Sequence, residues 1–200
     1  SRVSIDAVTA MTVRMKDEAR QVELVEGRAK FDVAKDPLRP FTVAAGDKLI
    51  AAVGTSFSVE MIDGDVRVIL YEGQVEIRDR TDSAPGPAAS SRRLLMTPGS
   101  EFIGAAGSGK PGQVTRPDLS QSLSWEQGLI NFDQEPLDRA VERMNRYSTK
   151  RIVLADPAVG SIAVDGVYKA GDVDAFVEGI VALHPVRQRR ANSEIILERE

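Results

Sequence analysis

The sequence predicts an all-β domain followed by a small α+β domain. Short extended runs separated by turn residues fill the chain to about residue 116, and no convincing helix interrupts them. Glycine and proline then recur between residues 104 and 118, where apolar periodicity is absent. Beyond this segment helical and extended runs alternate. We therefore expect an all-β domain at residues 1–118 and a domain of repeated β-α-β units at residues 119–200.

The first domain is expected to form a twisted two-layer or solenoid-like sheet. Val66–Leu70 alternates only at its start, which indicates a strand buried on both faces. Asp63-Gly64 suits a tight hairpin, and residues 81–91, which contain Pro85-Gly86-Pro87, suit a loop. The expected strands are Thr12–Met15, Gln21–Glu26, Ala29–Val33, Phe41–Ala44, Leu49–Val53, Ser56–Met61, Val66–Tyr71, Val75–Arg78, Arg93–Met96 and Glu101–Ile103.

The second domain is expected to repeat a strand-helix-strand pattern. Asp133 and Asp172 can cap the two helices, whose apolar residues recur at helical spacing. The second helix should bury Phe176, Ile180 and Leu183. In chain order the elements are strand Leu129–Phe132, helix Pro136–Tyr147, strand Arg151–Leu154, strand Ile162–Tyr168, helix Val173–Leu183, strand Val186–Arg190 and strand Glu194–Leu197.

Composition excludes several classes of function. A net charge of −4 argues against a nucleic-acid partner, because phosphate neutralisation needs a concentrated positive face. The one basic cluster, residues 187–190, is expected on a solvated surface. The chain has no cysteine, which removes disulfides and thiolate chemistry. No apolar run reaches the length of a membrane span, and no signal peptide is visible.

No residue pattern predicts a catalytic, cofactor or metal site. Gly104–Lys110 follows the pattern of a phosphate-binding loop, but Pro111 stands where the Mg²⁺-binding hydroxyl is required. His184 is the single histidine, and its place after a predicted helix end suits a helix-terminus role. Asp63-Gly64-Asp65 lacks the glutamate of a calcium loop. We therefore expect a protein that is not an enzyme, with no cofactor.

Four aromatic residues have predicted structural roles. Phe31, Phe41 and Phe57 lie on separate expected strands and should meet in the core. Trp125 is the lone tryptophan. Burying its ring would anchor the segment between the domains, whereas an exposed ring would suit a hot spot in a protein interface.

Motifs spread over much of the chain resemble the FecR family of transmembrane sigma-factor regulators. Their order and spacing carry the resemblance, which runs from about residue 20 to about residue 183. The motifs are Gly27–Val33, Arg39–Val43, Gly54–Val59, Glu72–Ile77, Pro98-Gly99, Trp125–Phe132, Pro136-Leu137 and Asn145–Ser148. The resemblance implies a FecR domain followed by a domain similar to the secretin-and-TonB short N-terminal (STN) domain.

The resemblance also implies location and partners. The chain begins with Ser1 and is expected to be the periplasmic part of a protein tethered to the inner membrane. A cytoplasmic domain that binds an extracytoplasmic-function (ECF) sigma factor, and a single membrane span, would lie outside it. The implied periplasmic partner is the signalling domain of a TonB-dependent outer-membrane transducer, which senses a ferric siderophore or another substrate. The alternative is a periplasmic structural or carbohydrate-binding β protein with an appended interaction module.

The expected contact surface is a strand edge of the second domain, where a partner strand could add. The first candidate is Arg151, Ile152, Val153 and Leu154, and the second runs from Ile162 through Val164 to Tyr168. Trp125 is a further candidate. Both strands could instead be paired fully within the domain. Proline at Val153 or Val164 would remove a backbone donor and test the idea.

Overall fold

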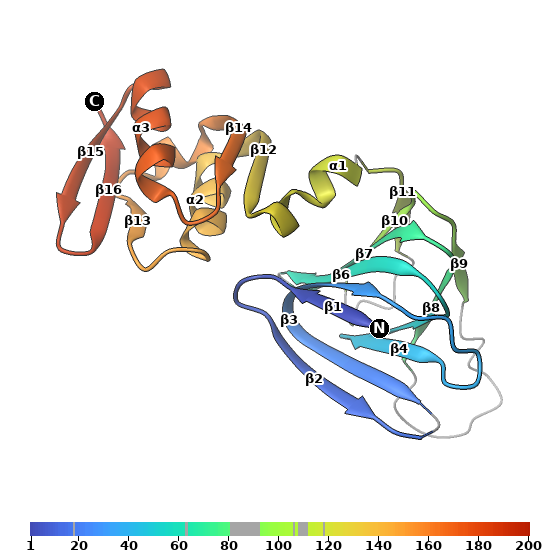
Figure 1. The fold of residues 1–200 in the computed structure, drawn as a ribbon. Helices are drawn as coiled ribbons and strands as arrows, with labels where there is room; N and C mark the ends of the chain where they lie inside the picture. Colours follow the sequence, from blue (N-terminus) through green and yellow to red (C-terminus); the bar gives the residue numbers. More distant parts are fainter. Residues whose placement is uncertain (18, 63, 81–92, 106, 108–111, 118) are drawn as a thin grey trace. The chain divides into compact units, whose positions relative to one another are not determined.

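The computed structural model describes residues 1–17, 19–62, 64–80, 93–105, 107, 112–117 and 119–200 (Figure 1). The chain forms two compact units, Ser1–Leu119 and Ser120–Glu200. Strands predominate, and the long helices belong to the second unit.

The first unit is a curled half-barrel sheet, which confirms its β class. In the described part of the unit, eleven strands form one hydrogen-bonded sheet. The strands are β1 (Arg2–Ile5), β2 (Ala10–Met15), β3 (Arg20–Asp32), β4 (Phe41–Ala45), β5 (Lys48–Ala52), β6 (Ser56–Ile62), β7 (Asp65–Glu72), β8 (Val75–Asp79), β9 (Leu94–Met96), β10 (Glu101–Ala105) and β11 (Gln113–Thr115).

Strand β3 joins the two branches of this sheet. Residues 20–24 pair with β4, which continues to β5, β8 and β9. Residues 27–32 pair with β6, which continues to β7, β10 and β11. Strands β1 and β2 both pair antiparallel with β3, along its C-terminal and N-terminal parts respectively. Both branches therefore depend on one strand.

The prediction of two separate strands at residues 21–26 and 29–33 was wrong. Gly27 has φ +86°, yet the strand continues through it. A Cβ at this position would lie 2.5 Å from Thr9 Oγ1 and 2.7 Å from the Val8 carbonyl oxygen. Glycine thus allows a left-handed backbone and a close approach without ending the strand.

One apolar core lies between the inner faces of the two branches. Phe31, Phe41 and Phe57 are fully buried, as predicted. The Phe31 ring lies 5.2 Å from that of Phe57 and 5.6 Å from that of Phe41, measured between centroids. Because the core draws on both branches, the sheet curls instead of lying flat.

Two strands at the margins of the sheet were not predicted. β1 and β11 are short and lack a clear apolar alternation. The hairpin between β6 and β7 does form, with Ile62 opposite Asp65 and Gly64 at φ +84°. Asp63 itself and the expected loop at residues 81–91 lie outside the described residues.

The second unit combines two small sheets with two helices. β12 pairs antiparallel with β14, while β13 runs parallel to β16, which also pairs antiparallel with β15. The strands that flank each helix therefore do not pair with each other. The elements are α1 (Leu119–Ser122), which precedes them, η1 (Ser124–Gln127), β12 (Leu129–Pro136), α2 (Leu137–Asn145), β13 (Arg151–Leu154), η2 (Pro157–Ser161), β14 (Ala163–Lys169), α3 (Val173–Leu183), β15 (Val186–Ala191) and β16 (Glu194–Arg199).

The expected cap at Asp133 was wrong, whereas the expected cap at Asp172 is confirmed. Asp172 accepts a hydrogen bond from the Ala175 amide at 3.2 Å. Asp133 lies inside β12, which continues to Pro136 through a bulge where Gln134 has φ +48°. The Gln134 amide donates to Asp165 Oδ1 at 2.8 Å, so β14 holds the bulge in place.

The core of the second unit lies between its helices and sheets. The Phe176 ring of α3 packs edge-on against Tyr168 at 5.1 Å and lies 5.6 Å from Phe132. Ile180 is buried as expected, but Leu183 is 74% exposed. As the last residue of α3, Leu183 projects past the packed elements.

Candidate interaction surfaces

Among the described strands, the outer strand β13 pairs only with β16. The Arg151 amide donates to the Ser193 carbonyl at 3.1 Å, and the Ala155 amide donates to the Leu197 carbonyl at 2.9 Å. Backbone groups alternate in direction along a strand. The amides of Arg151, Val153 and Ala155 therefore face β16, and those of Ile152 and Leu154 face away from it.

A side chain covers the middle of the outward edge of β13. Asn145, the last residue of α2, accepts a hydrogen bond from the Ile152 amide at 2.8 Å. Its side-chain amide donates to the Ile152 carbonyl at 2.9 Å. Asn145 thus supplies both contacts that a neighbouring strand would make there. A partner strand would have to displace it, which disfavours Arg151–Leu154 as a docking edge.

Strand β14 has a second outward edge, on the side that faces away from β12. The Ala170 amide donates to the Gly128 carbonyl at 2.8 Å, and the Leu137 amide donates to the Ile162 carbonyl at 2.8 Å. These bonds fix the alternation, so the even-numbered residues of β14 direct their backbone groups at β12. The odd-numbered residues Asp165, Val167 and Lys169 direct theirs to the other side, where the Lys169 carbonyl accepts a hydrogen bond from the Asp172 amide at 3.1 Å.

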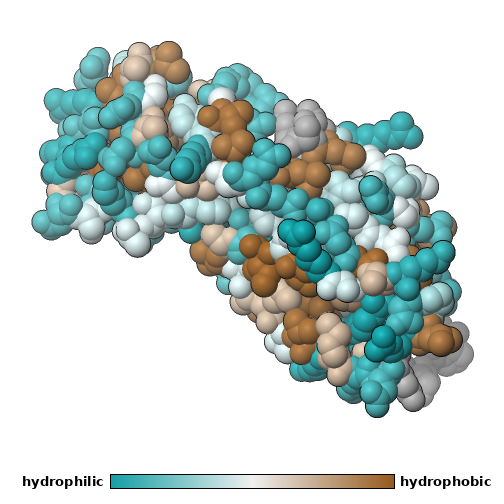
Figure 2. Space-filling view, in the orientation of Figure 1, coloured by the Kyte–Doolittle hydropathy of each residue, from teal (hydrophilic) through white to brown (hydrophobic). Residues whose placement is uncertain are grey.

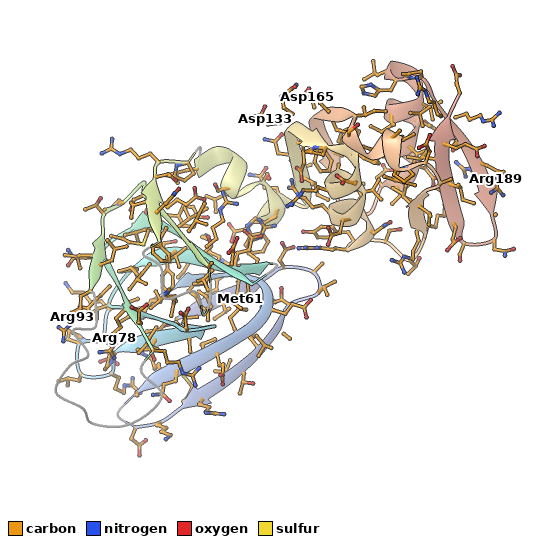
Figure 3. The ribbon with its side chains drawn as sticks, turned by 180° about the vertical axis from the view of Figure 1, so that it is seen from behind. Met61, Arg78, Arg93, Asp133, Asp165 and Arg189 are labelled. Carbon is orange, nitrogen blue, oxygen red and sulfur yellow. The ribbon has the colours of Figure 1, made fainter. Side chains whose placement is uncertain are left out.

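The side chains of β14 alternate in the same register. Val164 is 1% exposed, and Tyr168 is half-buried against the aromatic core. Val167 is 59% exposed, and Asp165 and Lys169 are exposed beside it. Figure 3 shows Asp165 and Asp133 at the same end of the β12–β14 ribbon. Val167 therefore presents both backbone and side chain outward, whereas the predicted candidates Val164 and Tyr168 do not.

The remaining candidates are placed as follows. Ile162 precedes β14 and is half-buried, with its carbonyl engaged by α2. Trp125 is 9% exposed in η1, which favours the anchoring role over an interface role. Arg189, in the basic run of β15, points outward in Figure 3 and is exposed, as expected for a solvated surface.

A carboxylate of α3 ties together the ends of β13 and β15. Asp174 accepts a hydrogen bond from Lys150 Nζ at 2.8 Å and pairs with Arg190 at 3.0 Å. The hydrogen bond from Lys150 and the two positive charges hold the pKa of Asp174 below its usual value of 3.8. The three side chains are 39–56% exposed, so the tie is a surface one.

The ion pairs of Asp174 with Lys150 and Arg190 predict that the stability of the second unit depends on pH. Because the folded pKa of Asp174 is lowered, its contribution to stability is present above the unfolded pKa and is lost as pH falls through the folded pKa. Asp174→Asn should therefore lower the urea midpoint of the second unit at neutral pH and leave it unchanged below the folded pKa. Urea unfolding of both proteins across acid pH measures this. A difference that persists undiminished in strong acid would contradict it.

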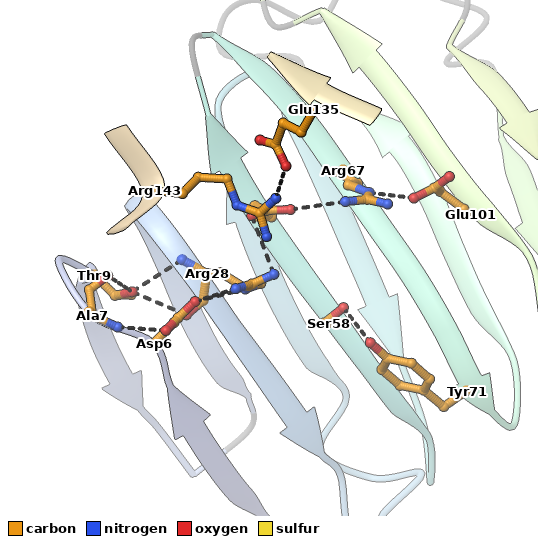
Figure 4. A network of polar contacts seen from close by, with 11 residues as sticks. Asp6, Ala7, Thr9, Arg28, Ser58, Arg67, Tyr71, Glu101, Glu135 and Arg143 are labelled. Carbon is orange, nitrogen blue, oxygen red and sulfur yellow. Dashed lines mark hydrogen bonds and ion pairs between the residues drawn. The ribbon is translucent and has the colours of Figure 1, made fainter. Parts of the chain in front are cut away.

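Alternating charges cross the outer face of one branch of the first unit (Figure 4). Arg28 on β3 pairs with Asp6 at 2.5 Å and with Glu60 on β6 at 3.6 Å. Arg67 on β7 pairs with Glu60 at 3.5 Å and with Glu101 on β10. Glu101 is only 5% exposed. Arg28, Glu60 and Arg67 each lie between two opposite charges, so this ladder holds the strands in register.

Lys48 is a buried cation that the sequence pattern did not indicate. It is 4% exposed, and its Nζ lies 2.6 Å from Asp79 and 3.3 Å from Asp47. Burial lowers the pKa of a lysine, but the hydrogen bond to Asp79 and the two negative charges outweigh burial and raise the pKa of Lys48 above 10.5. The arrangement is that of a structural ion pair joining β5 to β8.

The described residues contain no candidate metal site. No three or more acidic, histidine or cysteine residues gather into a possible metal site within the described ranges. His184 is the C-cap residue of α3, and its amide donates to the Ile180 carbonyl at 3.0 Å. Most of the Gly104–Lys110 run lies outside the described residues. Among the described helices, none has the length and apolar content that a membrane crossing requires.

Comparisons with known proteins match the observed fold. The family model described as FecR protein matches residues 1–76. Two crystal structures, each of a "putative anti-sigma factor" from Parabacteroides distasonis, resemble the chain at 25% identity and TM-scores of 0.75 and 0.74. Each similarity covers 99% of this chain, and 90% and 89% of the respective solved chain. No curated protein matches the sequence.

Proposed function

We propose that this chain is the periplasmic signal-relay part of a FecR-like sigma-factor regulator. The FecR match at residues 1–76 and the similarity to anti-sigma factor structures over 99% of the chain support a sigma-factor regulator role. In this proposal the protein is not an enzyme, and it works by binding other proteins. The ECF sigma factor would bind a cytoplasmic domain outside this chain, joined to it through a membrane span.

The second unit is the part proposed to receive the signal. Its two small sheets around α2 and α3 suit the STN-like domain that the FecR resemblance implies. The proposed partner is the signalling domain of a TonB-dependent outer-membrane transducer, presented in the periplasm. Main-chain hydrogen bonds to an added strand would supply affinity, and side chains beside the edge would supply specificity.

The outward edge of β14 carries the proposal. Val167 turns both backbone and side chain away from the unit, whereas the Asp165 side chain is bonded to Gln134 and the Lys169 carbonyl accepts from the Asp172 amide at 3.1 Å. The other candidate edge, on β13, has its central residue engaged by Asn145. An incoming strand therefore meets the outward amide and carbonyl of Val167 at the middle of β14, and an occupied amide and carbonyl at the middle of β13. The mixed charge of Asp165 and Lys169 would favour one register over its neighbours.

The test is proline at a position that spares the internal ladder. Val167→Pro removes an amide that faces the open side of β14, so pairing with β12 should survive. We expect binding to the isolated transducer signalling domain to weaken by at least about tenfold, because a main-chain bond is lost and the ring obstructs the added strand. Calorimetric titration of the full chain measures the loss, and circular dichroism confirms the fold.

The matched control is Val167→Thr. It keeps the amide and the β-branched shape, so binding should stay within about threefold of the parent. Proline at Val164 is unsuitable, since its amide faces β12 and the change would damage the unit itself. If folded Val167→Pro binds the signalling domain as tightly as the parent, β14 is not the contact. If the parent chain binds no transducer signalling domain, the relay proposal itself is wrong.

A further inference from the structure

Strand β2 is an exposed edge of the first unit. It pairs antiparallel with β3, and no other described strand pairs with it. Five of its six residues are exposed, whereas the facing residues of β3 include the buried Val22 and Leu24. Strands with one free side offer a row of backbone donors and acceptors to another chain.

The direction of the backbone groups along β2 follows from the turn that ends it. The Lys16 amide donates to the Ala19 carbonyl at 2.9 Å, and the Ala19 amide donates back at 3.4 Å. In an antiparallel pair such mutually bonded pairs alternate with pairs that lack bonds. Thr12 and Arg14 therefore face β3 with their backbone, and Met11, Val13 and Met15 face the open side.

The side chains of these three outward residues are apolar and share one face of the sheet. Met11, Val13 and Met15 lie opposite Leu24, Val22 and Arg20 respectively, on the face that covers the core. Met11 packs against the core, but Val13 is 46% exposed and Met15 is 58% exposed. Apolar surface is visible over the region of β2 and β3 in Figure 2. The core-facing side of the sheet thus ends in exposed apolar residues.

Hydrogen bonds and an ion pair to Arg28 fix the backbone just before β2. Asp6 pairs with Arg28 at 2.5 Å, and the Arg28 amide donates to Thr9 Oγ1 at 3.1 Å. Thr9 Oγ1 in turn donates to the Arg28 carbonyl at 3.1 Å. These contacts fix the turn between β1 and β2, so the edge is already in an extended shape. An ordered edge loses little conformational freedom when a second strand adds to it.

We propose that β2 is a docking edge for β2 of a second copy of this chain. Antiparallel self-pairing with Val13 on the two-fold axis places Met11 opposite the partner's Met15, so each apolar residue meets an apolar one. On the other face Arg14 lies opposite the partner's Thr12, and Lys16 lies opposite the partner's Ala10. No like charges face each other in this register.

Neighbouring registers are less favourable. A shift that centres the axis on Arg14 sets two arginines directly opposite each other, which is destabilising. A shift that centres the axis on Thr12 sets Met15 opposite the partner's Thr9, so Met15 has no apolar residue facing it. The register centred on Val13 also overlaps more of the six-residue strand than the one centred on Arg14, and as much as the one centred on Thr12. A contact this short buries less than a standard protein interface, so the dimer is expected to form at high protein concentration.

The first experiment measures self-association of the full chain by sedimentation velocity over rising concentration. The parent should form dimers, and Val13→Pro should raise the dimer dissociation constant at least about tenfold while circular dichroism is unchanged, because the lost amide faces the open side. Val114→Pro, on the exposed strand β11, is the matched control and should dimerise like the parent. A parent that stays monomeric at millimolar concentration overturns the proposal.

Charge and crosslinking test the register. Thr12→Lys places a lysine opposite Glu23 in its own chain, which favours the fold, and opposite the partner's Arg14, which should weaken the dimer at least about tenfold. Val13→Cys introduces the single thiol of the chain at the axis, where the Cα separation of about 5.5 Å suits a disulfide. Its oxidation to a covalent dimer should be at least about tenfold faster than that of Val114→Cys. Equal rates, or unchanged association of Thr12→Lys, would exclude this edge.

Discussion

Phe31→Ala is expected to cost the first unit about 3–5 kcal/mol of its free energy of unfolding. The ring is fully buried and contacts both Phe41 and Phe57. It therefore joins strands from both branches, and its removal leaves a cavity that neither branch can fill alone. Urea unfolding followed by circular dichroism measures the loss.

Two further variants calibrate that result. Phe31→Leu keeps most of the apolar volume and should cost only about 1–2 kcal/mol. Leu38→Ala truncates a residue that is 89% exposed and should stay within about 0.5 kcal/mol of the parent. If Phe31→Ala were no more harmful than Leu38→Ala, the ring would not be central to the core.

Asn145→Ala is expected to destabilise the second unit by about 2–4 kcal/mol. The change removes both hydrogen bonds to the backbone of Ile152, whose side chain is buried, and leaves an amide and a carbonyl without these partners. Hydrogen exchange provides a local measurement, since the Ile152 amide should exchange faster by a factor that matches the lost stability.

Asn145→Asp separates the two bonds. An aspartate still accepts from the Ile152 amide but cannot donate to its carbonyl, so the cost should be about half that of the alanine variant. Equal stability of Asn145→Ala and the parent would show that the side chain does not hold β13.

The sequence predicted the positions of strands and helices better than it predicted which strands pair with each other. Alternation and turn residues placed most strands, and the range Val173–Leu183 and the cap at Asp172 were both confirmed. The break expected near Gly27 was wrong, because a glycine with positive φ can end a strand or bend it, and local sequence does not distinguish the two. Whether β12 would pair with β13 or with β14 depends on contacts between distant residues, which periodicity does not report.

The interaction surfaces illustrate the same limit. Arg151–Leu154 has the pattern of an outer strand, and it is one. Only the structure shows that Asn145 from another element engages its free side. Likewise β2 has an ordinary strand pattern, and its exposure follows from where the sheet ends. The pattern within a strand indicates which residues share a face, whereas the availability of its edge depends on the rest of the fold.

The shared strand β3 has a consequence for how the first unit comes apart. Both branches are hydrogen-bonded to it, one through residues 20–24 and the other through residues 27–32. Loss of either branch therefore exposes the backbone of β3 and the core face on which the other branch depends. A partly open form loses both the hydrogen bonds to β3 and the burial of the shared core. The unit should populate an intact form and an unfolded form with little between them. A protease that cuts only unfolded segments would then find either no cleavable segment, in the intact form, or the entire unit open to cleavage, in the unfolded form.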